Sequence, residues 1–233
     1  MNKGSAAALA AGVVLTAILP HIPYVRALSR PLIWFSTLAH ECGHGITALL
    51  VGGGWRSIVI HTDAGGYAPV SYSGRVAGAL VAAGGLVGPA VVAAICFVLA
   101  RSARGSRAAL ALGALLLLLV LVTKAGSLFT AAFVGSCAVA FGLFAVYLGD
   151  EAARLGVSFL GVQLAATVFS RSDYLFTRVV NVTGSPQSSD VQAMADALWL
   201  PYWFWGIVCG LVSVGVLAMG LWAAVVEGPS APG

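Results

Sequence analysis

The stretch FSTLAHECGHGITALLVGG, residues 35–53, places two histidines and a glutamate in the middle of an otherwise apolar segment. His40, Glu41 and His44 form the pattern HExxH within a run that is apolar enough for a membrane helix. Ionisable side chains at membrane depth are costly unless they are partnered or functional. A bound metal ion would provide that compensation, so the stretch predicts a metal centre inside a helical bundle.

The spacing of the motif suits metal-assisted hydrolysis. On one helix, His40 and His44 lie one above the other and can bind a single ion at about 2.0 to 2.1 Å. Glu41 lies about 100° around the same turn, where it can accept a proton from water without being a ligand. We therefore expect one zinc ion per chain that polarises a peptide carbonyl and activates water, with Glu41 as the general base.

Composition places the whole chain in a membrane. Of its 233 residues, 60% are hydrophobic and 9% are charged, and the mean hydropathy is +0.97. Each spanning helix needs about 20 apolar residues. The apolar runs cover 5–20, 31–51, 76–100, 108–123, 125–149, 155–170 and 197–226. These runs predict an all-α integral membrane protein, a single domain over 1–233 with six to seven transmembrane helices.

The basic residues suggest how the bundle lies in the membrane. The net charge of +4 is scattered between the apolar runs, so we expect the lipid bilayer and no nucleic acid as a partner. Arg101, Arg104 and Arg107 form the densest basic loop, which the positive-inside rule places in the cytoplasm. Segments 52–75 and 171–196 then share the opposite side. We interpret the run 5–20 as a retained anchor helix rather than a cleaved signal peptide.

Features outside the motif predict local structure. Residues 52–74 hold short β-branched and aromatic stretches between glycine pairs, which predicts a small β-hairpin at the membrane face. Gly84 and Gly88 have a GxxxG spacing that would let a neighbouring helix approach, although a generic glycine-rich helix explains them equally well. The cysteines lack CxxC spacing and are interpreted as small core residues; they are Cys42, Cys96, Cys137 and Cys209.

A catalytic zinc site usually needs a third protein ligand. The candidates are His21, His61, Asp63, Asp173, Asp190 and Asp196. Asp190 is favoured because it follows the loop TGSPQSS and begins a plausible helix, although Ser188, Ser189 and Asp190 are all good N-cap residues. Asp63 and His61 remain open as alternatives. Asp150 and Glu151 lie beside Arg154 and are interpreted as a loop charge cluster.

Four stretches of the chain resemble the site-2 protease class of intramembrane zinc metalloproteases, peptidase family M50, in its compact bacterial M50B-like branch. They are HECGHGITALLVGG, GGYAPV, AAGGLVGP and SSDVQAMADALWLPYWFW, between Trp34 and Trp205. The resemblance implies a helical core with His40, His44 and Asp190 as zinc ligands and Glu41 as the base. It also implies a substrate-binding edge strand made of Gly65, Gly66, Tyr67, Ala68, Pro69 and Val70.

Two departures from the family pattern concern substrate selection. Better-known members carry Asn-Pro-Asp-Gly or Leu-Asp-Gly around the aspartate, whereas this chain has Ser-Ser-Asp-Val. The chain also lacks room for the PDZ or CBS domains of larger relatives, so gating would come from the bundle or from a regulatory membrane partner.

The leading hypothesis is a multi-pass protease of the bacterial cell membrane that hydrolyses peptide bonds of membrane-embedded protein substrates. The main alternative is a zinc-binding membrane protein without proteolytic activity, regulatory or chaperone-like. Glu41 argues against it, because a structural site has no use for a base. A metal-ion transporter is disfavoured because ionisable groups are scarce in the other apolar runs.

The sequence assigns no functional role to several further residues. Ser36, Thr37, Thr47 and the turn 52–54 could line a water path, but hydroxyls in membrane helices more often bond to their own carbonyls. The aromatic residues near the last helix are expected to mark the membrane interface; they are Trp199, Tyr202, Trp203, Phe204 and Trp205. Arg171 and Arg178 are interpreted as loop cations.

Overall fold

The structure is a computed structural model that describes residue 14 and residues 26–170, 172–182 and 185–226. Its long helices are α2 (Arg26–Leu50), α3 (Arg75–Leu99), α4 (Ala103–Lys124), α5 (Leu128–Tyr147), α6 (Asp150–Ser170) and α8 (Tyr202–Val226). Shorter elements are η2 (Ser172–Phe176), α7 (Asp190–Leu198), β1 (Gly54–Trp55), β2 (Val59–Ile60), β3 (Gly66–Tyr67), β4 (Val70–Ser71), β5 (Val179–Val182) and β6 (Ser185–Ser188). Apart from Val14, the expected N-terminal anchor, 5–20, lies outside the described residues, and so does His21.

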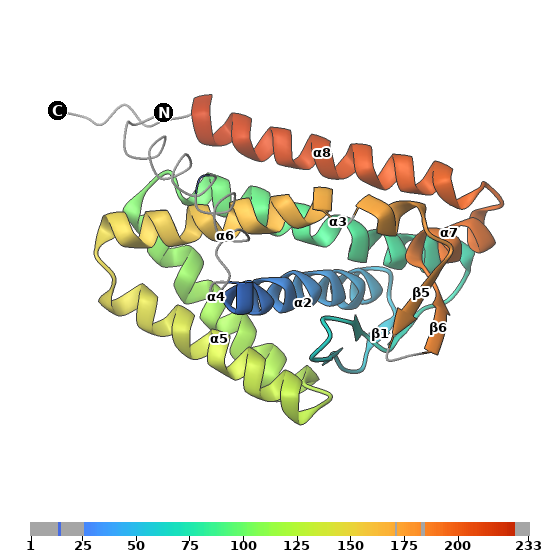
Figure 1. Cartoon of the computed structure of the whole chain (residues 1–233), viewed down its shortest axis with the longest axis horizontal. Helices are drawn as coiled ribbons and strands as arrows, with labels where there is room; N and C mark the ends of the chain where they lie inside the picture. Colours follow the sequence, from blue (N-terminus) through green and yellow to red (C-terminus); the bar gives the residue numbers. More distant parts are fainter. Residues whose placement is uncertain (1–13, 15–25, 171, 183–184, 227–233) are drawn as a thin grey trace.

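The six long helices run alternately in opposite directions (Figure 1). As a result, the segments 51–74, 125–127, 172–182 and 185–201 meet at one end of the bundle, which we call the hairpin end. The opposite end holds the basic α3–α4 junction. There Arg107 lies 2.9 Å from Asp150 and Arg154 lies 3.0 Å from Glu151. The two polar segments therefore share one end, as expected. The acidic pair forms the predicted charge cluster, but in the first turn of α6 rather than in a loop.

Helix α3 lies at the centre of the bundle, because small residues on it allow close neighbours. Ala90 and Ala93 are fully buried against α2, α6 and α8. A Cβ atom at Gly84 would lie 2.0 Å from the Thr47 hydroxyl oxygen, and one at Gly88 would lie 3.0 Å from the Ala39 carbonyl. Both glycines of the GxxxG pattern thus face α2, so the structure decides in favour of close helix approach.

The predicted β-hairpin is present as four very short strands. Outer strands β1 and β4 pair antiparallel, and inner strands β2 and β3 pair as Val59 with Tyr67 and Ile60 with Gly66. Gly52, with φ of 78°, provides the left-handed turn that leads from α2 into β1. The expected continuous strand over 65–70 is instead interrupted at Ala68 and Pro69, because β3 and β4 pair with different partners.

The last apolar run, 197–226, spans two elements. Helix α7 ends at Leu198, Trp199 adopts a left-handed conformation with φ of 63°, and α8 starts after Pro201. Proline lacks the N–H that a continuing helix would need, so the break falls there. The β5–β6 hairpin within the second polar segment was not predicted, although VVNV followed by TGSP is a strand-and-turn pattern.

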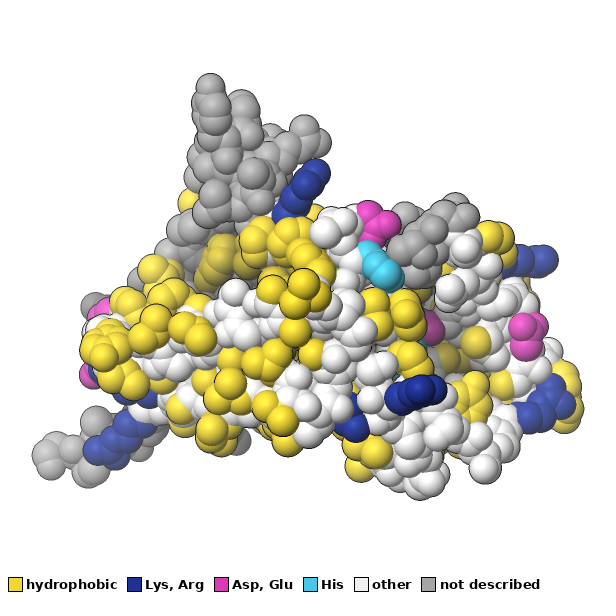
Figure 2. Space-filling model, turned by 90° about the horizontal axis from the view of Figure 1, so that it is seen from below, with side chains coloured by type: hydrophobic (Ala, Val, Ile, Leu, Met, Phe, Trp, Pro, Cys, Tyr) yellow, Lys and Arg dark blue, Asp and Glu magenta, His cyan; other side chains and the backbone are white. Residues whose placement is uncertain are grey.

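Four described helices are long and apolar enough to cross a membrane, namely α3, α4, α5 and α8. Helices α2 and α6 have sufficient length but carry more polar residues. Large apolar side chains remain exposed on the four spans, including Val122 at 83% and Leu211 at 67%. Figure 2 shows broad hydrophobic patches on one face of the molecule. Such surface needs lipid rather than water around it, so the chain is an integral membrane protein.

The cysteines and the aromatic residues near the last helix differ in their exposure. All four cysteines are free, and Cys209 is buried between α3 and α7. Trp199 and Trp203 are exposed at the hairpin end, where the membrane interface was expected. Trp205 differs, because it packs inward against the cluster that joins α3, α7 and α8.

Close contact between α2 and α3 yields a stability prediction. A Cβ atom at Gly43 would lie 2.2 Å from the Gly84 carbonyl oxygen, so Gly43→Ala must push the two helices apart. We expect a loss of about 1 to 3 kcal/mol in unfolding free energy, measured by thermal unfolding in detergent. The matched control is Gly156→Ala on α6, where a Cβ atom meets nothing within 4 Å. Equal stability of the two variants would contradict the close packing.

Candidate metal centre

His40 and His44 project from α2 toward α3 at the hairpin end. Gly85 of α3 makes room for the second imidazole, since a Cβ atom there would lie 2.2 Å from His44 Cε1. His44 Nδ1 lies 2.8 Å from the carbonyl oxygen of Val81. A carbonyl can only accept, so Nδ1 carries a proton, and Nε2 is the ring nitrogen that would bind a metal ion. Metal-binding histidines are commonly oriented by such a hydrogen bond from the ring nitrogen that does not bind the metal.

Asp190 reaches the histidines from the first turn of α7. Ser189 is the N-cap residue, and its hydroxyl accepts a hydrogen bond from the Gln192 N–H. The Ser189 backbone N–H in turn bonds to the Arg178 carbonyl at 2.9 Å, which fixes the start of α7. Because Ser189 caps the helix, the Asp190 carboxylate is free to face His40 and His44.

The three side chains form a cluster with the dimensions of a zinc site. The two imidazole Nε2 atoms lie 3.1 Å apart, and Asp190 Oδ2 and Oδ1 lie 3.2 and 3.4 Å from Nε2 of His40 and His44. Ligand atoms 2.0 to 2.2 Å from a tetrahedral ion lie roughly 3.3 to 3.6 Å from one another. Asp190 Oδ2 is buried and has no hydrogen bond of good geometry. The residues present therefore fit a divalent metal ion.

The charge state of Asp190 also suits a ligand. Burial alone would raise the pKa of this carboxyl, but the adjacent His44 and His40 imidazoles hold that pKa well below its usual range. The group is therefore an ionised carboxylate at neutral pH, as metal binding requires.

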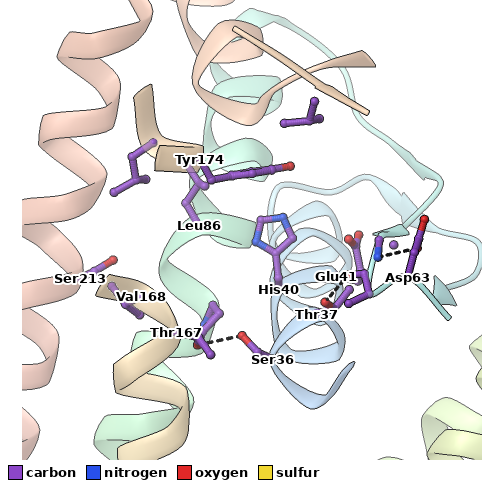
Figure 3. Close-up of a pocket in the computed structure, with 16 residues that line it drawn as sticks. Ser36, Thr37, His40, Glu41, Asp63, Leu86, Thr167, Val168, Tyr174 and Ser213 are labelled. Carbon is purple, nitrogen blue, oxygen red and sulfur yellow. Dashed lines mark hydrogen bonds between the residues drawn. The ribbon is translucent and has the colours of Figure 1, made fainter. Parts of the chain in front are cut away.

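Glu41 lies beside this cluster and is almost fully buried, with 4% of its surface exposed. Two hollows meet at Glu41, His40 and Gly66, which line both of them. One, the outer groove of about 210 Å³, runs between strand β3 and the β5–β6 hairpin past Asp190. The other, the inner cavity of about 240 Å³, extends between α2, α3, α6 and α8 (Figure 3). The glutamate thus faces space that a substrate and water could occupy.

Strand β3 is held close to Glu41 by contacts at Gly66 and at the preceding Ala64. A Cβ atom at Gly66 would lie 2.7 Å from Thr37 Cγ2 and 3.2 Å from Glu41 Oε1, so only glycine lets the strand lie here. Thr37 donates a hydrogen bond to the Ala64 carbonyl at 2.9 Å. Ser36, the other hydroxyl of this turn, donates to Thr167 of α6 at 2.8 Å. These contacts give both hydroxyls a structural role.

The hairpin is also pinned to α4 and α5. The Ile60 N–H donates to the Thr130 hydroxyl at 2.8 Å, and the Ile58 N–H donates to the Lys124 carbonyl at 2.7 Å. The Lys124 ammonium donates to the Trp55 carbonyl at 2.6 Å. These bonds satisfy backbone groups that would otherwise be orphaned at membrane depth.

The other candidate third ligands lie away from the cluster or outside the described side chains. Asp63 accepts a hydrogen bond from the Gly65 N–H at 3.0 Å and lines the inner cavity. His61 stacks at 5.8 Å on Tyr67, and exposed Asp196 accepts from Gln192 at 2.8 Å. The side chain of Asp173 is not among those described. Of the described candidates, the structure joins Asp190 alone to the two histidines.

Sequence reasoning missed two residues around the centre. Tyr174 of η2 lies edge-on to His40 with 5.9 Å between ring centroids and lines both hollows. Val81 contributes only its carbonyl oxygen. No sequence pattern identifies a backbone carbonyl as a partner, and a single tyrosine in a polar segment carries no signal of its own.

These features define a helical membrane protein with a candidate metal centre built on HExxH and a distant aspartate. A family model described as Peptidase M50B-like matches residues 6–220, and the chain belongs to that family. The match confirms the resemblance drawn from the four sequence stretches. Searches among curated proteins and among solved structures found no match to this chain.

Metal content tests the cluster directly. We expect about one zinc per chain in purified wild type, and its loss in His44→Ala and in Asp190→Ala, because either change leaves two protein ligands. Asp196→Ala is the matched control on α7, since that carboxylate is exposed and bonded to Gln192. Elemental analysis after zinc reloading provides the measurement. Zinc that persists in Asp190→Ala would exclude this carboxylate as the third ligand.

Thr130 yields a separate prediction about the hairpin. Thr130→Val leaves the buried Ile60 N–H without its acceptor, which costs about 1 to 3 kcal/mol of unfolding free energy. Zinc content should stay at the wild-type level, because β2 and β3 hold none of the three clustered side chains. The control is Thr123→Val, whose exposed hydroxyl bonds only within α4. Thermal unfolding in detergent that does not distinguish the variants would argue against this anchor.

Proposed function

We propose that this protein is an intramembrane zinc metalloprotease that hydrolyses peptide bonds of membrane-embedded protein substrates. The observation that carries the proposal is the meeting of His40, His44 and Asp190 ligand atoms within 4.8 Å of one another, beside a buried glutamate. Membership of a peptidase family that matches nearly the whole chain gives the same reaction class independent support.

Each residue has a role that follows from its position. His40, His44 and Asp190 would hold the ion, which supplies a Lewis acid that polarises a carbonyl and lowers the pKa of water. Glu41 would take the proton from the attacking water as general base and pass it to the leaving amine. Its burial and its place at the junction of the two hollows suit both transfers.

The substrate would bind as an extended strand. A transmembrane helix hides its carbonyl groups in internal hydrogen bonds, so a substrate must unwind before it can be cleaved. Strand β3 pairs with β2 on one side only, which leaves its other edge free to bond an extended peptide. The outer groove runs along Gly66, Tyr67, Ala68 and Val70, consistent with the substrate-binding stretch expected from the sequence.

The arrangement in the membrane follows from the alternating helices. We propose that α2 and α6 also cross the bilayer, which gives six described spans and accommodates the polar HExxH residues inside the bundle. The basic α3–α4 junction would face the cytoplasm, and the hairpin end the opposite side. A partner in the membrane remains a proposed source of regulation.

Glu41→Gln separates proteolysis from zinc binding without catalysis. The amide cannot act as a base, so we expect cleavage to fall by about 10² to 10⁴-fold while zinc content is unchanged. Cleavage of a single-span model substrate in lipid vesicles is followed by gel and mass spectrometry. A chelator should abolish wild-type cleavage and added zinc should restore it. Full zinc with no wild-type cleavage across a broad substrate set would favour the non-proteolytic alternative.

A further inference from the structure

The inner cavity has no role in the proposal above, yet it opens directly onto the reacting centre. It shares His40, Glu41 and Gly66 with the outer groove and extends away from them between α2, α3, α6 and α8. In Figure 3, Leu86, Val168 and Ser213 lie on the far side of His40 from Asp63. A peptide bound along β3 alternates its side chains between opposite faces. One side chain beside the reacting carbonyl would therefore point into the inner cavity.

The end of the cavity away from Asp63 suits an apolar group. Leu86 and Pro89 of α3 and Val168 of α6 provide apolar surface there, beside the Ser213 hydroxyl, whereas Asp63 lies on the other side of His40 (Figure 3). The hydroxyl groups of Ser36, Thr37 and Thr167 already donate their hydrogens to Thr167, the Ala64 carbonyl and the Leu164 carbonyl. With these three donors engaged inside the protein, the end of the cavity at Leu86 and Val168 has, apart from Ser213, less to offer a polar side chain than an apolar one.

The volume of the inner cavity limits the size of the substrate side chain that it can hold. An apolar cavity of about 150 Å³ is enough to hold a benzene molecule. The inner cavity, at about 240 Å³, can therefore accept a side chain as large as a phenyl ring. A small side chain such as alanine would leave most of this space unfilled and gain less from burial.

We propose that the inner cavity binds the substrate side chain that flanks the cleaved bond and selects large apolar residues there, with Leu86 and Val168 determining the size. The inference rests on the proposed protease function. The specificity would come from this cavity and from two residues of its wall, Leu86 on α3 and Val168 on α6.

The experiment uses the full chain in phosphatidylcholine and phosphatidylglycerol vesicles with a library of single-span peptides. Cleaved bonds are mapped by mass spectrometry, and the two residues that flank a mapped bond are then varied through Ala, Leu, Phe and Trp. Rates are compared as ratios within each enzyme variant, so a loss of folded or zinc-loaded protein cancels. Wild type should cleave the Phe substrate about tenfold faster than the Ala substrate at one flanking position.

Two cavity variants should move this ratio in opposite directions. Val168→Phe fills the cavity, so the ratio of Phe to Ala cleavage should fall by about tenfold. Leu86→Ala enlarges it, so the Trp substrate should gain severalfold relative to Phe. The matched control is Val214→Phe on α8, where the side chain is 44% exposed and lies outside the cavity. That control should keep the wild-type ratio.

The outcomes separate this inference from the proposed function. Wild-type cleavage with no size preference at either flanking residue overturns the inference and leaves the protease function standing. The inference is also overturned if neither cavity variant changes the relative cleavage rates of the substrates. The same holds if Val214→Phe changes these relative rates as much as the cavity variants do. If zinc-loaded wild type cleaves no peptide of the library, the proposed function fails and the inference fails with it.

Discussion

The close approach of α2 and α3 is the constraint on which the rest of the structure depends. Glycines at the contact let the two backbones meet, and this proximity brings the Val81 carbonyl to the Nδ1 atom of His44. A helix in lipid gains nothing from burying apolar side chains against another helix, so tight packing and polar contacts must hold the pair. The same contact therefore stabilises the bundle and orients one imidazole of the candidate centre.

A second constraint comes from irregular backbone at the hairpin end. Nonhelical segments at membrane depth must satisfy their N–H and C=O groups within the protein. The β1–β4 hairpin meets this requirement through bonds to α2, α4 and α5, including the buried Thr130 hydroxyl. Because its strands are only two residues long, the position of β3 depends on these neighbours more than on its own ladder.

Much of the site could be predicted from the sequence because its information is local. HExxH specifies both imidazoles and the glutamate through helix geometry alone, and a run of apolar residues predicts a helix wherever it stands. The third carboxylate was harder, since Ser188, Ser189 and Asp190 are all suitable N-cap residues. In the structure, Ser189 is the N-cap residue. Its position depends on hydrogen bonds that its hydroxyl and its N–H donate to the carbonyl groups of Thr177 and Arg178.

Other features were beyond local patterns. The break between α7 and α8 falls inside an apolar run, where the residues on both sides of the boundary are equally hydrophobic. Only Pro201 marks the boundary in the sequence. The inner cavity is formed by four helices that are far apart in the sequence, so no single stretch indicates it. The role of Gly85 likewise depends on which helix lies opposite, which α3 by itself does not specify.

The position of Asp190 near the end of the chain has a consequence for biosynthesis. Residues enter the membrane in order, and a chain that has inserted its described helices only as far as α6 carries two of the three clustered side chains. Two histidines make an incomplete site for a hydrolytic metal ion. In the proposed protease, a nascent or truncated chain would therefore lack an intact metal centre until α7 has docked against α3. The order of the elements would then act as a safeguard against premature cleavage by the proposed protease during membrane insertion.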